Sequence, residues 1–288
     1  MNQLPRLPDE TVTPVTPSRS GLDGNAVQLP QEELDLRNRK LGHECVSRAQ
    51  DVVAERYRLG SADEALGLLK AVSQRCNVKL HTMADAVVRM PGPDRGAAVW
   101  FPGRRRHGPP RLPGVVVDHG SRGSQGAVLG AALDRVLTIT QTPMGNIQLA
   151  DGGRLRLARH RGLNKYFTDF FAFVDDSTTA CSQAAAERRQ VTVRDVATAA
   201  VFDDASRYAI LQAGSRAAHS VPLVDGKGTV LGMASSHHER PLTRLSAAQL
   251  AALQQTGTDV GRWLAWHWHT VVLDALEQLH ATATTARD

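Results

Sequence analysis

Residues 49–88 read AQDVVAERYRLGSADEALGLLKAVSQRCNVKLHTMADAVV, and this stretch decides the fold of the N-terminal part of the chain. Apolar residues recur there at the i, i+3, i+4, i+7 spacing of an amphipathic helix, in three successive segments. The stripes are Val46, Ala49 and Val53, then Ala65, Leu68, Leu69 and Val72, then Leu80, Met83, Ala84 and Val87. Helices this short are stabilised mainly by burying their apolar faces, so the sequence predicts a three-helix bundle.

Capping residues mark the ends of the second helix. Ser61 and Glu64 stand three positions apart before an apolar run, which is the spacing of a capping box. We therefore expect the helix to begin near Ser61. Asn77 tolerates the left-handed conformation that closes many helices, and the next stripe starts at Leu80, so we expect the helix to end near Asn77.

Six cations lie mostly outside the apolar stripes. They are Arg48, Arg56, Arg58, Lys70, Arg75 and Lys79, and nearby carboxylates leave only a small positive excess. Charged helix faces usually serve solubility, so composition alone favours a solvated face over a nucleic-acid surface. The fold does not require these cations, however, and both interpretations stay open.

Small, apolar and basic residues also follow a definite order through all three expected helices. The positions are Ala49–Glu55-Arg56-Tyr57, Ser61-Ala62-Asp63-Glu64-Ala65-Leu66, Leu68-Leu69-Lys70, Asn77-Val78-Lys79-Leu80 and Ala84–Val87-Val88. This order resembles the ANTAR domain, a bacterial RNA-binding antitermination module. The resemblance implies a homodimer that binds paired hairpins in leader transcripts. It implies phosphate or loop contacts by Arg56, Lys70 and Lys79, and base stacking on Tyr57, for which half-buried packing is the alternative.

Two positions depart from this resemblance. Many ANTAR domains have Lys-Gly directly after the alanine of the first helix, whereas this chain has Gln50 and Asp51. The resemblance therefore implies weaker RNA binding, or an altered sequence preference, where this cation is missing. The alternative function is therefore a protein-interaction protein, or a degenerate ANTAR signalling protein without RNA affinity.

Composition and cysteine usage bound the class of protein. A length of 288 residues suits two domains. The formal charge of +5 and the pI near 9.4 suit an anionic partner. Cys45, Cys76 and Cys181 have no paired spacing, so neither a disulfide framework nor a CxxC metal site is implied. The sequence has no apolar leader and no run long enough to span a membrane, so we expect a cytoplasmic protein with no membrane partner.

Low-complexity stretches divide the chain. Residues 1–30 are rich in Pro, Thr, Ser and Gly and predict a disordered tail, and residues 91–124 predict a Pro, Gly and Arg-rich linker. Between them, residues 31–90 form the ANTAR-like domain. An apolar island in the linker, Val99-Trp100-Phe101, is expected to dock on a neighbouring domain, because an exposed Trp-Phe pair favours aggregation.

From Gln125 onward the pattern becomes mixed. Short strands flank Asp151-Gly152 and Asp225-Gly226, which indicates two β-hairpins. We expect strands at 144–149, 155–158, 191–196, 218–224 and 230–236, and helices at 128–139, 166–174, 177–189, 202–213 and from Ser246. Hairpins with helices before, between and after them predict an antiparallel sheet covered by helices, so the fold class is α+β.

The second half resembles a GAF domain, a small-molecule sensor fold. The matching residues are Met144–Leu149, Arg161-Gly162-Leu163, Phe170-Phe171, Asp175-Asp176, Ala180-Cys181, Val193–Val196, Ser220–Leu223 and Leu231-Gly232-Met233. The resemblance implies a domain at 125–270 with a pocket between the sheet and the helices covering one face. The implied lining candidates are Phe170, Phe171, Phe173, Cys181 and Met233, with plain core packing as the alternative. It does not identify a ligand or cofactor.

Enzymatic and metal sites are not expected. The sequence contains no HExxH, GxSxG or GxxxxGK[ST] motif, and the rival interpretation of a small-molecule enzyme lacks acid–base candidates. His237-His238 and His267/His269 have spacings that place the side chains of each pair on different faces. We therefore expect no catalytic residue and no metal ligand.

The last helix carries an apolar stripe that extends beyond the GAF-like region into residues 271–288. Leu264, Trp268, Val272, Ala275 and Leu279 form this stripe. A second copy of the chain would cover it in a homodimer, or it would fold back on the helix at 128–139. Because the RNA module precedes the sensor, we expect the sensor to act across the Pro-rich linker and not through a helix leaving its C-terminus.

Overall fold

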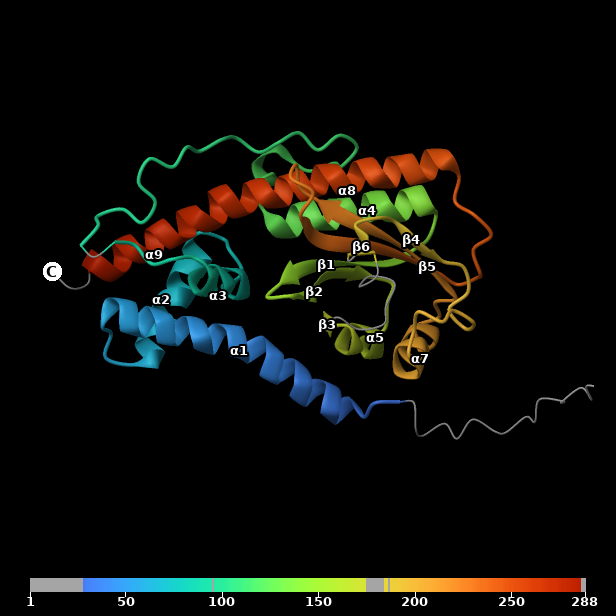
Figure 1. Cartoon of the computed structure of the whole chain (residues 1–288), viewed down its shortest axis with the longest axis horizontal. Helices are drawn as coiled ribbons and strands as arrows, with labels where there is room; N and C mark the ends of the chain where they lie inside the picture. The colour runs from blue at the N-terminus through green and yellow to red at the C-terminus, as the bar shows by residue number, and fades with distance from the viewer. Residues whose placement is uncertain (1–27, 95, 175–183, 186, 286–288) are drawn as a thin grey trace, which may run out of the picture.

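Two long helical segments lie on opposite sides of the molecule, and the longer of them runs most of its length (Figure 1). One is α1, Gln31–Tyr57, and the other is the continuous run of α8, Ala247–His267, the π-helix η2, Trp268–Val272, and α9, Leu273–Thr285. A helical bundle lies at one end of both segments and a sheet with its helices at the other. The computed structural model describes residues 28–94, 96–174, 184–185 and 187–285.

The bundle consists of the C-terminal part of α1 with α2, Ala62–Arg75, and α3, Leu80–Arg89. The predicted cap of α2 is confirmed, since Ser61 Oγ accepts a hydrogen bond from the Glu64 N–H at 3.1 Å. The Glu64 carboxylate accepts from the Gly60 N–H at 2.8 Å, one residue earlier than a regular capping box requires. Asn77 has the expected left-handed conformation, with φ of 50°.

Helix α1 begins far ahead of its apolar stripe and leaves the bundle. Its N-terminal part packs on α5, Lys165–Phe170, of the other domain, where Leu34 is fully buried. Asn38 Nδ2 donates to the Asp169 carbonyl at 2.8 Å, and the Arg37 guanidinium donates to the Phe170 carbonyl. One helix therefore contacts both domains.

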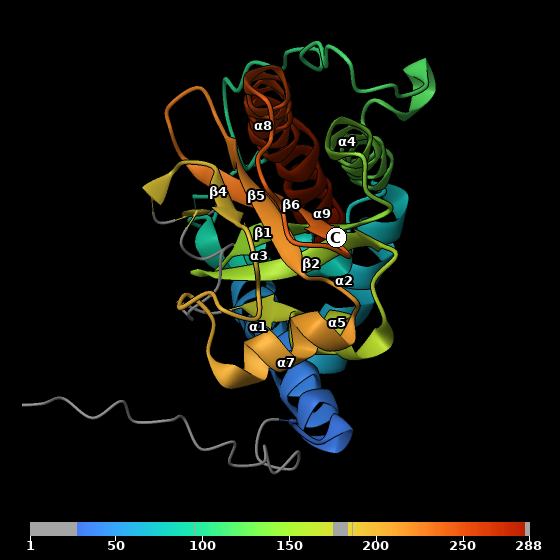
Figure 2. The same ribbon diagram turned by 90° about the vertical axis from the view of Figure 1, so that its right-hand side faces the viewer.

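The second domain contains a six-stranded antiparallel sheet in the order β3-β2-β1-β6-β5-β4. Helices α4, Gln125–Thr140, and α8 cover one face, while α5 and α7, Asp204–Gln212, cover the other (Figure 2). The predicted α+β class and both hairpins are confirmed. The strands are β1 Met144–Asp151, β2 Arg154–Arg161, β3 Phe173–Val174, β4 Val191–Val193, β5 Ala217–Val224 and β6 Val230–His238.

Two elements differ from the expected ones. The helix expected at 166–174 ends at Phe170, and Phe173–Val174 instead pair with β2 as an edge strand. The strand expected at 191–196 stops at Val193. The helix expected at 177–189 falls mainly outside the described residues.

Two glycines let α8 lie directly on β5. A Cβ at Gly257 would lie 2.4 Å from the Pro222 carbonyl oxygen, and a Cβ at Gly261 would lie 2.2 Å from that of Val224. Both distances are far shorter than a normal contact between a Cβ and an oxygen atom that are not bonded to each other. The close approach of this helix to the sheet therefore depends on the absence of a side chain at these positions.

The bundle of the same chain covers the C-terminal apolar stripe. Val272, Ala275 and Leu279 are fully buried in one apolar cluster with residues of α1, α2 and α3. The expectation that a second copy or the helix at 128–139 covers this part of the stripe is wrong. The earlier Leu264 packs in the core between the sheet, α4 and α8.

The apolar island of the linker docks as expected. Trp100 is 5% exposed and joins the cluster of the bundle and α9. Its N–H and that of Phe101 donate to the Glu277 carboxylate of α9 at 2.9 and 2.8 Å, and Trp100 Nε1 donates to the Pro91 carbonyl at 2.8 Å. The linker therefore runs along the C-terminal helix and is fixed to it (Figure 1).

These contacts correct the expected route between the domains. The helix that leaves the C-terminus of the second domain packs directly on the bundle, and α1 contacts both domains. Coupling across the linker alone was expected because the bundle comes first in the sequence. Sequence order did not reveal that the last helix returns to it.

Candidate functional site

Three cations lie on the surface at the corner between α2 and α3. Lys70, Arg75 and Lys79 are exposed. Within the part of the chain that the structure describes, their side chains make no hydrogen bond or ion pair. Lys79 occupies the N-cap of α3, four residues after the end of α2 at Arg75. Unpaired surface cations of this kind are suited to phosphate contacts.

Arg56 is placed differently from Lys70 and Lys79. Its guanidinium carbon lies 4.7 Å from the centre of the Trp100 ring, and the side chain is half-buried. Burial lowers the pKa of Arg56, although an arginine stays charged. Arg56 Nη1 is buried without a hydrogen-bond partner. The linker therefore covers this candidate RNA contact.

Tyr57 is not a surface for base stacking in this conformation. It is 3% exposed, and its hydroxyl lies 3.0 Å from His280 Nδ1 of α9. Burial raises the pKa of Tyr57 to about 12. The expectation of a stacking residue is corrected, because the ring belongs to the core formed by the bundle with α9.

Gln50 has a structural partner. Gln50 Nε2 donates to the Ala62 carbonyl at 3.1 Å and so ties α1 to the first turn of α2, while Asp51 is exposed. Gln50 therefore links the first two helices, at the position where many ANTAR domains have a lysine.

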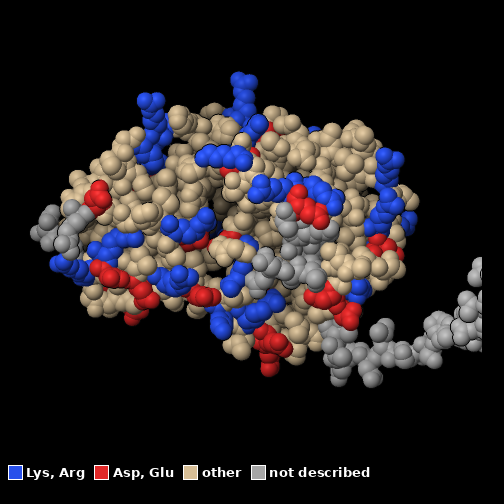
Figure 3. Space-filling model, viewed as in Figure 1, with Lys and Arg blue, Asp and Glu red and all other residues tan. Residues whose placement is uncertain are grey.

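Surface charge is distributed over both domains. On the face shown in Figure 3, Lys and Arg side chains are interspersed with Asp and Glu, and a hollow opens between the domains with basic side chains beside it. The positive excess is thus not confined to the bundle.

A small cavity of about 30 Å³ lies between the sheet and the layer of α5 and α7. Phe167, Phe171, Val174, Phe202 and Ile210 supply most of its apolar wall. A volume of this size holds about one water molecule and no organic ligand. In this conformation the inner pocket expected for a GAF fold is filled by side chains.

Polar residues of the sheet line the same cavity. His237 Nε2 lies 3.0 Å from Asn146 Oδ1, and His237 Nδ1 lies 3.1 Å from Ser215 Oγ. Burial lowers the pKa of His237 to about 3, with a smaller contribution from His238. Gln148 Nε2 donates to the Phe171 carbonyl at 3.1 Å, while the buried Gln148 Oε1 has no hydrogen-bond partner.

The five pocket candidates have different positions. Phe171 lines the small cavity, and Phe170 and Met233 are buried in the apolar cluster beside it. Phe173 lies on the opposite side of its strand from Val174 and lines a space next to α1 and α3. Cys181 lies outside the described residues. The prediction that the inner cavity is lined by Phe170, Phe173 and Met233 is therefore wrong for this conformation.

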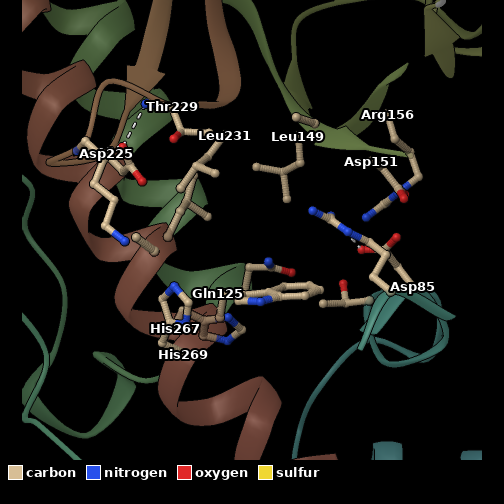
Figure 4. A pocket seen from close by; sticks show the side chains of 17 residues that line it. Asp85, Gln125, Leu149, Asp151, Arg156, Asp225, Thr229, Leu231, His267 and His269 are labelled. Atoms are coloured by element: carbon tan, nitrogen blue, oxygen red, sulfur yellow. Dashed lines mark hydrogen bonds and ion pairs between the residues drawn. The ribbon is translucent and has the colours of Figure 1, made fainter. Parts of the chain in front are cut away.

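A larger cleft of about 340 Å³ lies between the two domains. Figure 4 shows Leu149 and Leu231 on one side of it, Asp85, Asp151 and Arg156 on a second, and His267 and His269 on a third. The lining comes from α3, from both hairpins, and from the junction of α8 with η2. Sequence reasoning missed this cleft, because its residues come from segments without a common motif.

One polar contact joins the domains at the edge of this cleft. His81 Nδ1 of α3 lies 3.0 Å from Asp151 Oδ2 of the β1–β2 hairpin, and Arg156 Nε donates to the same carboxylate at 3.1 Å. Burial lowers the pKa of His81, and Arg156 lowers it further. Across the cleft, His267 is 2% exposed and its buried Nε2 has no hydrogen-bond partner.

Among the described residues, no group of three His, Cys, Asp or Glu side chains is placed to hold a metal. Similarly, no described helix is long and apolar enough to cross a membrane.

This geometry defines a two-domain protein in which a helical bundle with exposed cations at its α2–α3 corner is packed against an α+β domain. Comparison with family models matches residues 34–88 to the ANTAR domain and residues 124–265 to the GAF domain. The chain is therefore an ANTAR and GAF domain protein, in the predicted order. The ANTAR domain is that of RNA-binding antitermination regulators, and the GAF domain is a sensor domain.

Solved structures similar to this chain cover about half of it. They include a GAF domain/HD domain protein from Geobacter sulfurreducens, 15% identical over 52% of this chain and 98% of that chain, with a TM-score of 0.43. The GAF domain of an Acinetobacter phosphoenolpyruvate-protein phosphotransferase is 16% identical over 52% and 89%, with a TM-score of 0.42. Free methionine-R-sulfoxide reductase from Neisseria meningitidis is 15% identical over 50% and 92%, with a TM-score of 0.35. No curated protein matches the chain.

Proposed function

We propose that this protein is a cytoplasmic regulator of transcription antitermination whose ANTAR helices bind hairpins in leader RNA. The observation that carries the proposal is the exposed set Lys70, Arg75 and Lys79, whose side chains form no hydrogen bond or ion pair in the described part of the chain. Phosphate contacts from such residues give affinity and orientation, while loop bases give specificity. The proposed role is binding and not catalysis.

The GAF domain is proposed to sense a small molecule and to pass its state to the ANTAR domain. Two helices support this coupling. Helix α1 packs against both domains, and α9 packs on the bundle while it continues from α8 of the GAF domain. Burial of Arg56 and Tyr57 supports a conformation in which part of the RNA surface is covered. A homodimer, suited to a paired hairpin, remains part of the proposal.

Gln50 and Asp51 favour a second candidate function, a degenerate ANTAR protein that signals through protein contacts without binding RNA. One measurement, the affinity for RNA, distinguishes the two candidate functions. A two-hairpin leader RNA is titrated with the full chain, with Lys70→Ala/Lys79→Ala, and with the control Lys40→Ala on the distant part of α1.

We expect the double variant to bind RNA at least about tenfold more weakly, because each lost phosphate contact is worth about 1 kcal/mol or more. The control should bind like the unmodified chain. Absence of RNA binding by the unmodified chain would support the second candidate instead. Equal RNA binding by the double variant and the control would show that Lys70 and Lys79 are not the RNA contacts.

A further inference from the structure

We propose that the cleft between the two domains binds a small organic anion with an apolar body, and that this ligand contacts the ANTAR and GAF domains at once. The cleft lies on the face of the sheet covered by α4 and α8, and the inner GAF cavity lies on the other face. Its volume of about 340 Å³ falls within the range of small-molecule sites. The inner cavity, at about 30 Å³, is too small for such a ligand.

The apolar part of the ligand is matched by the cleft's walls. Leu149 of β1, Leu231 of β6 and Leu264 of α8 line it, and the half-buried Trp268 adds an aromatic surface. Apolar walls with a few polar groups are the usual composition of a ligand site, because burial gives affinity and the polar groups give orientation.

The charge of the ligand follows from which polar groups already have partners. Asp85 accepts from Arg89 Nη1 at 3.2 Å, and Asp151 accepts from Arg156 Nε. Asp225 accepts the backbone N–H groups of Lys227 and Thr229, both at 2.8 Å. All three carboxylates that line the cleft are therefore engaged.

Hydrogen-bond donors remain available in the same cleft. Lys227 is exposed at its edge, and among the described residues its ammonium group makes no hydrogen bond or salt bridge, although its charge helps to lower the pKa of Asp225. Arg156 uses only Nε in its contact with Asp151, which leaves its terminal nitrogens for a ligand. Every carboxylate of the cleft already accepts a hydrogen bond, while Lys227 and the terminal nitrogens of Arg156 can still donate, so an anion is the better match.

A buried histidine at the opposite wall provides a second, independent observation. His267 lines the cleft and is only 2% exposed. Its Nε2 atom has no hydrogen-bond partner among the described residues. A buried polar atom without a partner costs free energy, and a ligand atom would remove that cost. The π-helix that starts at Trp268 lies directly beside it, and π-helical turns occur frequently at functional sites.

The position of the cleft gives the ligand a regulatory consequence, which rests on the proposed function. Thr82, Asp85 and Arg89 belong to α3 of the ANTAR domain, while the other walls belong to the GAF domain and the long helix. A ligand that touches both domains stabilises the conformation in which they are packed together. It would therefore change RNA affinity without contacting the RNA.

The test uses 8-anilinonaphthalene-1-sulfonate, a fluorescent amphipathic anion, titrated into the full chain. We expect saturable binding at one site per chain. Lys227→Glu should weaken it by about tenfold or more, because a charge-assisted contact becomes a repulsion. Leu231→Trp should abolish it by filling the cleft, and circular dichroism checks that this variant stays folded.

The matched control is Lys70→Glu, a charge reversal at an exposed lysine of the ANTAR surface. It should leave binding of the probe unchanged while it weakens RNA binding, so the two proposals can fail separately. Absence of saturable binding, or equal binding by Lys227→Glu, Leu231→Trp and the unmodified chain, would overturn the proposed site. Loss of RNA binding alone would not.

Discussion

Tyr57 and His280 meet in the protein core, with the tyrosine hydroxyl 3.0 Å from His280 Nδ1. The two residues are 223 positions apart and belong to the first ANTAR helix and the last helix of the chain. His280 Nε2 also lies 2.8 Å from the Ala97 carbonyl of the linker. Three distant parts of the sequence are therefore joined through one histidine.

Removing the Tyr57 hydroxyl tests this junction. In Tyr57→Phe the buried His280 nitrogen loses its partner, so we expect the free energy of unfolding to fall by about 1–3 kcal/mol. The measurement is urea unfolding followed by circular dichroism. The control Tyr208→Phe removes an exposed hydrogen bond to Gln28 and should cost less than about 0.5 kcal/mol. Equal effects in both variants would contradict the buried junction.

Glu277 is predicted to hold the Trp100–Phe101 segment over Arg56. Glu277→Ala removes the acceptor of two backbone N–H groups, so residues 96–106 should exchange amide hydrogens faster and Arg56 should become accessible. Hydrogen exchange by mass spectrometry measures the first effect, and RNA titration measures an expected severalfold gain in affinity. The exposed Glu239→Ala serves as control. Unchanged exchange in the segment would show that Glu277 does not hold it.

Three buried histidines whose pKa is strongly lowered predict loss of stability in mild acid. Burial lowers the folded-state pKa of His237 to about 3 and those of His219 and His267 to about 4, from an ordinary 6.5. Below pH 6.5 the unfolded chain takes up protons that the folded chain does not. The stability is thus complete above pH 6.5 and declines from there toward pH 4.

Between pH 7.5 and 5 each of these histidines should cost about 2 kcal/mol, measured by urea unfolding at both pH values. His237→Asn should show a pH dependence smaller by about that amount. A free energy of unfolding that does not change over this range would contradict neutral buried histidines.

Close packing of α8 on β5 predicts opposite effects of two Gly→Ala changes. Gly261→Ala would place a Cβ 2.2 Å from the Val224 carbonyl oxygen and should destabilise the protein by about 3 kcal/mol. Gly130→Ala lies in α4 with no atom within 4 Å of the added Cβ, and should stabilise by about 0.5–1 kcal/mol. Thermal unfolding distinguishes them, and a neutral Gly261→Ala would refute the close approach.

Local signals predicted the elements better than the contacts between them. Ser61 with Glu64 predicts the start of α2, and the Asp-Gly turns predict both hairpins, because each signal acts within a few residues. Tyr57 could not be placed in this way. Its environment is set by α9, and no periodicity in the first helix indicates which side the last helix covers.

The candidate sites follow the same division. The exposure of Lys70 and Lys79 could be predicted from their positions off the apolar stripes. The burial of Arg56 could not, because Trp100 covers it from a linker that has no regular structure of its own. The interdomain cleft was missed for a similar reason, since Arg89, Arg156, Lys227 and His267 are brought together only by domain packing.

The salt dependence of RNA binding tests the central claim most directly. The full chain is titrated against a two-hairpin leader RNA and against duplex DNA at several salt concentrations. We predict tighter binding to the RNA, and a plot of log affinity against log salt whose slope becomes shallower by about 0.7–0.9 for each of Lys70 and Lys79 replaced by alanine. Equal affinity for both nucleic acids, or slopes unchanged by these replacements, would contradict specific RNA recognition by the ANTAR helices.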